Sequence, residues 1–129
     1  MNKFYLEETK FTPEITLDAE SKTIELKGKS YPENTFDFYE PMINWLEEYF
    51  ETSSKEKTVV NLEIIYFNSS SSKLFFDFFD ILEDAVGSGH EIEINWIYDE
   101  DNENAEEAGE DYQDDFQDLN FNLVVKEQD

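Results

Sequence analysis

Cysteine and arginine are absent from this sequence, and its 129 residues hold only one histidine, four glycines and three prolines. Without cysteine, neither a disulfide bond nor a thiolate metal site can form. Without arginine, no guanidinium can clamp a phosphate through two parallel hydrogen bonds. A single histidine, His90, gives no basis for a serine–histidine–aspartate triad, and no glycine-rich phosphate loop is present. We therefore expect no catalytic role.

Long apolar runs are missing as well. No stretch reaches the roughly 18 apolar residues that a membrane-spanning helix needs. The first ten residues, MNKFYLEETK, contain no continuous apolar segment of the kind found in signal peptides. Together these absences predict a cytoplasmic location as the default.

Positive charge is scarce throughout the chain. Nine lysines stand against 33 acidic residues, and the formal net charge is −24 at pH 7. Such a chain repels nucleic acids and anionic membrane surfaces. The acids are densest in Asp99–Asp118, which holds eleven of them in twenty residues and no basic residue. We expect protein partners with basic surfaces, which a strong field of one sign would attract.

Apolar and aromatic side chains are plentiful, at 39% hydrophobic residues with twelve Phe, seven Tyr and two Trp. A single domain over residues 1–129 is expected, long enough to bury about two thirds of its unfolded surface. The organising stretch is Thr58–Val86. Its β-branched residues predict a strand at Thr58–Phe67, and an apolar run of this kind suits a strand covered on both faces. From about Ser70, apolar residues recur every three or four positions, which predicts an amphipathic helix.

The remaining elements follow from alternation, helical periodicity and turn residues. Asn34 is a candidate N-cap with Asp37 as its partner, Pro41 is expected to kink the helix that follows, and Gly28 is expected to end a strand. The predicted strands are Lys3–Glu8, Glu14–Asp18, Lys22–Lys27, Glu91–Tyr98 and Phe121–Val125, and the predicted helices run from Asn34 to about Thr52 and over part of Asp99–Asp118. The sum is an α/β fold, a mixed sheet with an N-terminal antiparallel hairpin and then alternating helices and strands.

Three short motifs stand at the boundaries of these elements. They are Tyr66–Ser71 (YFNSSS), Ser30–Asn34 (SYPEN) and Asn95–Asp99 (NWIYD). At these spacings they resemble the motifs of the SiaC family of bacterial regulatory phosphoproteins, and the resemblance spans nearly the whole chain. Proteins of that family look like STAS domains, the fold of anti-sigma-factor antagonists, so a STAS-like domain is implied. The implied partners are a Ser/Thr protein kinase, a PP2C-type phosphatase and an effector, which in the best-known branch is a diguanylate cyclase.

Ser69 is the candidate phosphorylation site. In the resembling family, a Thr or Ser directly after the motif Asn carries a reversible phosphate, and Ser69 holds that position. Ser70 and Ser71 remain alternatives because four serines follow one another. Spacing alone leaves open the structural interpretation in which these serines only cap the helix. A phosphate would add about −1.5 to −2 charge, at a helix end that favours negative charge, one turn before Lys73.

A partner-facing surface is also implied by the resemblance. Its candidate residues are Tyr31, Pro32, Glu33, Asn34, Asn68, Ser70 and Lys73. A proline-containing loop followed by an N-cap would explain the first four equally well. Trp96 and Tyr98 alternate with polar residues, which favours packing in the core over binding.

The leading hypothesis is a non-enzymatic regulatory phosphoprotein in a partner-switching pathway, without metal or cofactor, in which phosphorylation at Ser69 controls the binding of an effector. The alternative is a small acidic interaction scaffold or ligand-binding domain without a phosphorylation cycle. A calcium loop is disfavoured. Asp99, Asp101, Glu103 and Glu110 have the spacing of EF-hand ligands, but Asn104 stands where the sharp turn requires glycine.

Overall fold

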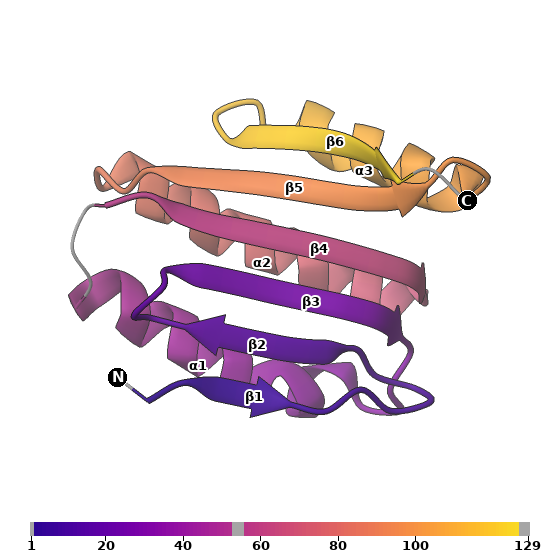
Figure 1. Ribbon diagram of the computed structural model, residues 1–129, viewed down its shortest axis with the longest axis horizontal. Coiled ribbons are helices and arrows are strands. Elements are labelled where there is room, and N and C mark those ends of the chain that lie inside the picture. The colour runs from indigo at the N-terminus through magenta and orange to yellow at the C-terminus, as the bar shows by residue number, and fades with distance from the viewer. Residues whose placement is uncertain (1, 53–55, 127–129) are drawn as a thin grey trace.

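The computed structural model describes residues 2–52 and 56–126 of the chain. Three strands precede the first helix, and helices and strands alternate from there to the last strand (Figure 1). The elements are β1 (Phe4–Leu6), β2 (Glu14–Asp18), β3 (Thr23–Ser30), α1 (Thr35–Thr52), β4 (Thr58–Phe67), α2 (Ser69–Gly87), β5 (Ile92–Asp99), α3 (Glu103–Asp115) and β6 (Asn120–Lys126). The strand at Thr58–Phe67 and the end of the first helix at Thr52 agree with the sequence prediction. A kink at Pro41, which lies inside α1, stays a prediction.

A single six-stranded sheet holds all the strands, in the same order as in the chain. β1, β2 and β3 pair antiparallel, whereas β3, β4, β5 and β6 pair parallel. Each parallel step needs a crossover, and α1, α2 and α3 supply the three crossovers. The α/β class, the N-terminal hairpin and the alternation of helices and strands are therefore confirmed. The STAS-like label stays a prediction.

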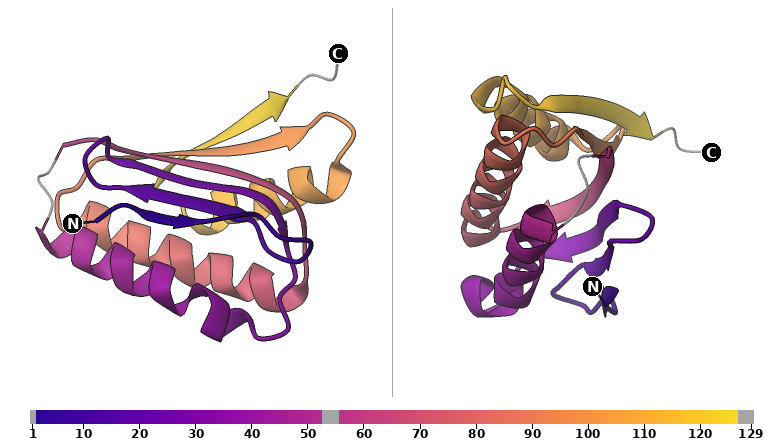
Figure 2. Two further views of the ribbon diagram at one scale, coloured as in Figure 1. Left: turned by 60° about the horizontal axis from the view of Figure 1, so that its bottom comes forward. Right: turned by 90° about the vertical axis from the view of Figure 1, so that its left-hand side faces the viewer.

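All three helices lie against the same face of the sheet, and the opposite face is open in the described part of the chain (Figure 2). Burial consequently alternates along β4. Val60, Leu62 and Ile64 are buried against the helices, while Asn61 and Glu63 are only partly covered. The expectation that this strand is covered on both faces was wrong. Its β-branched residues suit either arrangement, and the polar side chains at every second position are the feature that distinguishes them.

The core lies between the sheet and the helices. Leu74, Phe75, Phe78, Phe79 and Leu82 form the apolar face of α2, and each is at most 2% exposed. Burying a side chain of this size stabilises a fold by about 1.5–3 kcal/mol, so α2 is held mainly by its packing. In agreement with the sequence analysis, Trp96 and Tyr98 of β5 are also buried. Of the described helices, none is both long and apolar enough to cross a membrane.

The strand β3 continues past Gly28, which was expected to end it. Gly28 has φ +132°, a conformation that L side chains rarely adopt, and a Cβ there would collide with Glu8 and approach the Pro13 backbone. The register against β4 shifts between Gly28 and Lys29, after which Ser30 pairs with Phe67. Glycine thus marks a bulge within the strand rather than its end. The bulge places Ser30 beside the last residue of β4, directly before α2 begins.

Candidate functional site

The N-terminus of α2 is formed as the sequence predicts, with one difference. Asn68 is the N-cap, and its side-chain oxygen accepts a hydrogen bond of 2.9 Å from the backbone N–H of Ser71. Ser69 is therefore the first residue of the helix rather than its cap, and its side chain is exposed. Because Asn68 already provides the capping oxygen, the fold does not require the Ser69 hydroxyl for that purpose.

The four serines lie in very different environments. Ser69 and Ser70 are exposed, whereas Ser71 is fully buried. The Ser71 hydroxyl lies 2.7 Å from the hydroxyl of Ser30, which in turn lies 2.6 Å from the Tyr39 hydroxyl. Burial raises the pKa of the Tyr39 phenol, while its hydrogen bond with Ser30 acts in the opposite direction. This chain of hydroxyls joins β3, α1 and α2 beneath the exposed serines.

The fourth serine connects α2 to α3. The Tyr112 hydroxyl donates to the backbone oxygen of Ser72 at 2.9 Å and also lies 3.1 Å from its side-chain hydroxyl. Beside this contact, α2 and α3 enclose a hollow of about 440 Å³, and both Ser69 and Lys73 lie on its wall. The other lining residues are Ser72, Phe76, Ala108, Asp111, Tyr112 and Asp115. An exposed serine thus stands at the rim of a groove with apolar and acidic walls.

Lys73 is the only basic residue in the three described helices, which carry five, four and seven acidic residues in chain order. It lies one turn after Ser69, where a single ammonium can approach an anion on that hydroxyl. Since the chain has no arginine, no rigid bidentate contact could hold such an anion against the protein. The helix layer as a whole is therefore an acidic surface with one basic position near Ser69.

The loop from β3 to α1 lies next to this helix start. Asn34 caps α1 as predicted, because its side-chain oxygen accepts from the N–H of Asp37 at 3.2 Å and its amide donates to the Asp37 carboxylate at 2.7 Å. Tyr31 contacts two other aromatic rings edge to face. Its ring centroid is 5.3 Å from that of Phe11 and 5.4 Å from that of Tyr66.

Of these rings, those of Phe11 and Tyr31 border a second and larger hollow of about 670 Å³. It is lined by Thr9, Phe11, Thr12, Tyr31, Pro32, Glu33 and Phe38. The structure thus places Tyr31, Pro32 and Glu33 together at one hollow, and Ser69 and Lys73 at the other. The start of α2 directly follows β4, which carries Tyr66, and it borders the hollow between α2 and α3.

Three exposed aromatic side chains near the site were not singled out from the sequence. Phe11, Tyr66 and Phe76 are 51%, 54% and 41% exposed. Tyr66 is part of a motif, but it was assigned to a strand without a binding role. Phe76 directly follows Phe75 on α2, and helical spacing places it away from the apolar face. The sequence does contain a signal for Phe76, because a large apolar side chain on the polar face of a helix is unusual.

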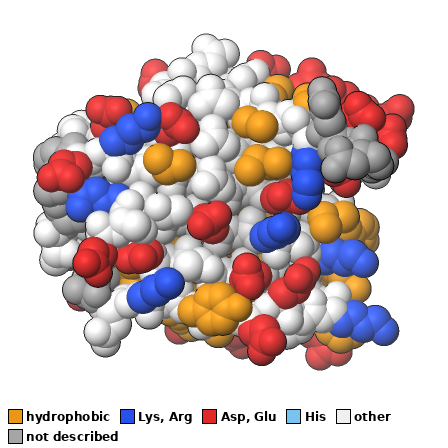
Figure 3. Space-filling view, in the orientation of Figure 1, with side chains coloured by type: hydrophobic (Ala, Val, Ile, Leu, Met, Phe, Trp, Pro, Cys, Tyr) orange, Lys and Arg blue, Asp and Glu red, His pale blue; other side chains and the backbone are white. Residues whose placement is uncertain are grey.

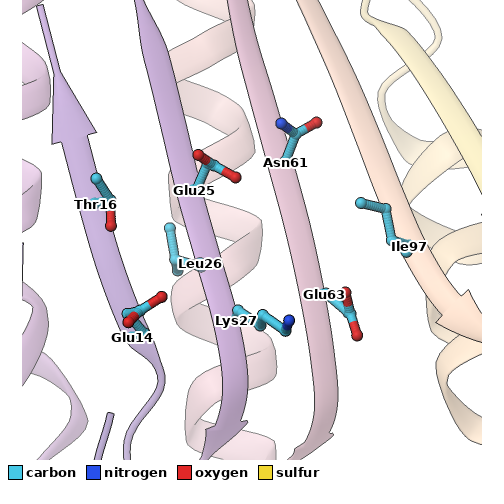
Figure 4. Close-up of a pocket in the computed structure, with 8 residues that line it drawn as sticks. All are labelled: Glu14, Thr16, Glu25, Leu26, Lys27, Asn61, Glu63 and Ile97. Atoms are coloured by element: carbon cyan, nitrogen blue, oxygen red, sulfur yellow. The ribbon is translucent and has the colours of Figure 1, made fainter. Parts of the chain in front are cut away.

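The open face of the sheet has a different chemistry. Acidic, basic and hydrophobic side chains are intermixed there (Figure 3), and a shallow hollow of about 100 Å³ lies across β2, β3, β4 and β5. Lys27 stands between Glu14 and Glu63 in this hollow (Figure 4), and the pairing register of the strands agrees with that placement. In the row beside it, Asn95 donates to Asn61 at 2.9 Å. This face therefore combines charges of both signs and paired amides with scattered apolar side chains.

The acidic segment does not form an EF-hand loop. Glu103 is the first residue of α3 and Glu110 lies within that helix, so the two cannot belong to one twelve-residue loop. Asn102 caps α3 by accepting from the N–H of Ala105 at 3.1 Å. In the part of the chain that the structure describes, no group of three or more acidic or histidine side chains is arranged to hold a metal ion.

An α/β domain with an exposed serine at the start of a central helix, beside aromatic and acidic hollows, has the features of a small protein-binding regulator. Comparison with known proteins agrees with this class. The model of the family described as "SiaC family regulatory phosphoprotein" matches residues 6–126. The chain belongs to the SiaC family.

Solved structures of SiaC from Pseudomonas aeruginosa share the fold. One is the apo form, with a TM-score of 0.82 and 26% identity, covering 98% of this chain and 99% of SiaC. Another shows the diguanylate cyclase SiaD in complex with its activator SiaC, with a TM-score of 0.84 and 28% identity, covering 97% and 99% of the two chains. An uncharacterized protein of P. aeruginosa strain UCBPP-PA14 is 31% identical over 115 residues, or 89% of this chain and 90% of that protein.

Proposed function

We propose that this SiaC family protein is a non-enzymatic switch in which phosphorylation at Ser69 controls the binding of an effector protein. A Ser/Thr protein kinase adds the phosphate and a PP2C-type phosphatase removes it. The effector is a diguanylate cyclase, by analogy with the complex in which SiaC is the activator of SiaD. The observation that supports this proposal most strongly is the position of Ser69, which is exposed, is the first residue of α2 and is not the cap.

Accessibility favours Ser69 and Ser70 over the third candidate. A kinase needs the hydroxyl in its own active site, and the Ser71 hydroxyl is instead buried in contact with Ser30. A phosphate at Ser71 would have to be desolvated among apolar side chains. On Ser69 the phosphate would remain in solvent at a helix end that favours an anion by about 0.3–1 kcal/mol. The fold should therefore tolerate the modification.

The same phosphate would weaken a protein contact at this place. Exposed Tyr66 and Phe76 give a partner apolar area in this region, and the hollow beside Ser69 already contains Asp111 and Asp115. A further charge of about −1.5 to −2 would be buried there, and Lys73 is the one basic residue in the lining of the hollow. Effector binding belongs to the unphosphorylated form for this reason.

The test uses the purified chain, its cognate kinase and the effector cyclase. Mass spectrometry after kinase treatment should map the phosphate to Ser69, and Ser69→Ala should remain folded, resist the kinase and still activate the cyclase. Ser69→Asp should remain folded and activate it less. Ser70→Ala is the matched control, because it removes a neighbouring exposed hydroxyl and should still be phosphorylated at Ser69.

Two results would contradict the proposal. One is a phosphate that maps to a residue other than Ser69. The other is equal binding of the effector by the phosphorylated and unphosphorylated chains, which would instead favour an acidic scaffold without a phosphorylation cycle. Circular dichroism of each variant separates a loss of binding from a loss of the fold.

A further inference from the structure

The two edges of the sheet differ in how much backbone they offer for pairing. At one edge β1 has only three residues, and an edge strand this short gives a partner little to bind. At the other edge β6 has seven residues and pairs, among the described strands, with β5 alone and without a bulge (Figure 1). It contains no acidic residue and no proline, and Val124 and Val125 are 38% and 50% exposed. The edge at β6 is therefore long, regular and apolar.

The charge that could protect this edge is directed elsewhere. A lysine on an edge strand discourages the pairing of a further strand. The only lysine of β6 is Lys126, and its ammonium group lies 3.1 Å from the carboxylate of Glu63 in β4. This ion pair spans β5, which lies between the two strands. It draws the Lys126 side chain over the open face of the sheet and away from the free edge.

Every second residue of β6 directs its backbone N–H and C=O groups to the free edge. Phe121 belongs to this set, because its N–H donates to the Leu119 carbonyl oxygen at 2.9 Å and its carbonyl oxygen accepts from the Gln113 side chain at 2.8 Å. Backbone groups alternate between the two edges along a strand, so those of Leu123 and Val125 also point outward. Within the described residues, these four groups have no hydrogen-bond partner.

The helix α3 backs the same edge with acidic side chains. Its hydrogen bond to the strand places Gln113 near the start of β6. Near the other end of β6, Val125 pairs with Tyr98, whose hydroxyl donates to Glu106 at 3.3 Å. Glu110 lies between Gln113 and Glu106 on one side of the helix, because residues three and four apart share a face. Both glutamates are exposed, so a strand added to β6 would meet two carboxylates on its helix side.

We propose that the free edge of β6 binds an extended segment of a protein partner, which extends the sheet by one strand and carries basic side chains at alternate positions. The outward groups of Leu123 and Val125 supply backbone hydrogen bonds, and the alternating side chains of the segment supply specificity. Lysine or arginine is favoured on the helix side, where Glu106 and Glu110 attract a cation. Neither glutamate lines the hollow beside Ser69, so this interaction does not depend on phosphorylation there.

A second copy of the same chain is a less favourable occupant. An antiparallel pair of β6 strands would bring two α3 helices together on one face of the extended sheet, and each helix carries seven acidic residues among its thirteen. The two chains would also repel each other as a whole, because each has a net charge of −24. A basic segment instead has the charge that complements this edge.

The test uses the full chain and the peptide acetyl-Lys-Val-Lys-Val-Lys-amide, whose sequence reads the same in both directions and therefore fits either strand polarity. Hydrogen exchange followed by NMR is the readout. In the free chain, the amides of Leu123 and Val125 should exchange faster than those of Asn122 and Val124, which face β5. At saturation the peptide should slow exchange at Leu123 and Val125 by about tenfold or more, and it should leave the other two amides unchanged.

Two methylated forms of the peptide separate strand pairing from attraction between charges. One form carries N-methyl groups on both valines, and the other carries them on the first two lysines, so their charges are equal. Successive residues of a strand point their N–H groups to opposite edges. Only one of the two forms should therefore lose affinity, by about tenfold or more, and which one does so identifies the polarity of the added strand.

Proline provides a matched pair of variants in the protein. Val125→Pro removes an outward N–H, which an edge strand tolerates, so this variant should remain folded and bind the peptide about tenfold more weakly or worse. Val124→Pro removes an N–H that faces β5, so it should lower the melting temperature much more than Val125→Pro does. Circular dichroism of both variants measures the difference.

Two pairs of substitutions in α3 test the charge of the segment. Glu106→Gln/Glu110→Gln should weaken peptide binding by about fivefold or more, because it removes both carboxylates beside the edge. Glu107→Gln/Asp114→Asn removes two charges at exposed positions outside this pair and outside the hollow beside Ser69. It should change the affinity by less than about twofold.

Three outcomes would overturn the proposal. Similar affinities of the two methylated peptides, whether retained or lost, would show that no strand is added. An equal loss of affinity in the two α3 variants would indicate attraction to the whole acidic surface. A dimer of the free chain in analytical ultracentrifugation that Val125→Pro dissociates would show that a second copy occupies the edge.

Discussion

The two ends of α2 differ in how their charges relate to the helix dipole. At the start, Asn68 caps the helix, no acidic residue stands in the first turn, and Lys73 follows one turn later. At the end, Asp84 lies beside Glu47 and Glu51 of α1, with no basic residue in the last turn of either helix. Stability alone would favour acids at the start and bases at the end. Both ends therefore depart from that rule, and such departures often mark functional sites.

The two departures have different physical consequences. The start of α2 is well formed by its cap and by the hydroxyl chain from Ser71 to Tyr39, so an anion can be added there without rearrangement. At the end, Glu47, Glu51 and Asp84 take part in no ion pair within the described residues, and because all three are exposed, solvent and salt screen their charges. An added anion can thus be accommodated at the start of α2, whereas the acidic side chains at its end are held apart from one another only by solvent.

The sharpest way to test the start of the helix is to place a charge at two neighbouring serines. Ser71→Asp should destabilise the fold by about 3 kcal/mol or more, because a carboxylate would be buried without a cation, in a position that is 0% exposed. Ser69→Asp should be neutral or slightly stabilising, since it adds an exposed acid to the first turn. Urea denaturation followed by circular dichroism measures both.

A Ser71→Asp variant within about 1 kcal/mol of the natural chain would show that the serine run is loosely packed. The distinction between an accessible Ser69 and a structural Ser71 would then be lost. Ser71→Ala provides the intermediate case, since it removes the hydrogen bond with Ser30 without adding a charge, and it should cost about 1 kcal/mol.

Removing the cap tests whether Asn68 or the serines hold the helix start. Asn68→Ala should destabilise the protein by about 1 kcal/mol, because the N–H of Ser71 loses its 2.9 Å acceptor. Asn68→Ser keeps a capping oxygen and should lose much less. The measurement is the urea midpoint together with hydrogen exchange at the Ser71 amide, which should accelerate in Asn68→Ala. Unchanged exchange in Asn68→Ala would mean that another residue of the run takes over the cap.

The sequence predicts most of this fold because its signals are local. The strand Thr58–Phe67, the helix ending at Thr52 and the Asn34 cap are each specified by neighbouring residues. Coverage of the sheet is not local. Whether Asn61 and Glu63 meet solvent or a second helix layer depends on which face of the sheet each of the three crossovers covers. Because each crossover is right-handed, that face is set by the order of the strands in the sheet, which no local pattern in the sequence specifies.

The candidate site divides in the same way. Motifs single out Tyr31, Asn68 and Ser69, but the distinction between exposed Ser69 and buried Ser71 depends on Ser30, 41 residues before Ser71. That contact depends in turn on the bulge at Gly28. A hollow lined by His90 at the end of α2 could not be predicted either, because its wall combines residues from α1, from α2 and from the chain just before β5.

The smallest expected effect is that of Gly87→Ala at the end of α2, where two glycines have opposite roles. Gly87 is the last helical residue, its φ is not positive, and a Cβ there would meet nothing within 4 Å. Gly87→Ala should therefore stabilise the protein by about 0.5 kcal/mol, mainly by restricting the unfolded chain. Gly89 has φ +105°, and Gly89→Ala should destabilise by about 1 kcal/mol or more. Thermal unfolding measures both shifts, and a loss of stability in Gly87→Ala would show that the chain leaves the helix one residue earlier, which would reshape the hollow beside His90.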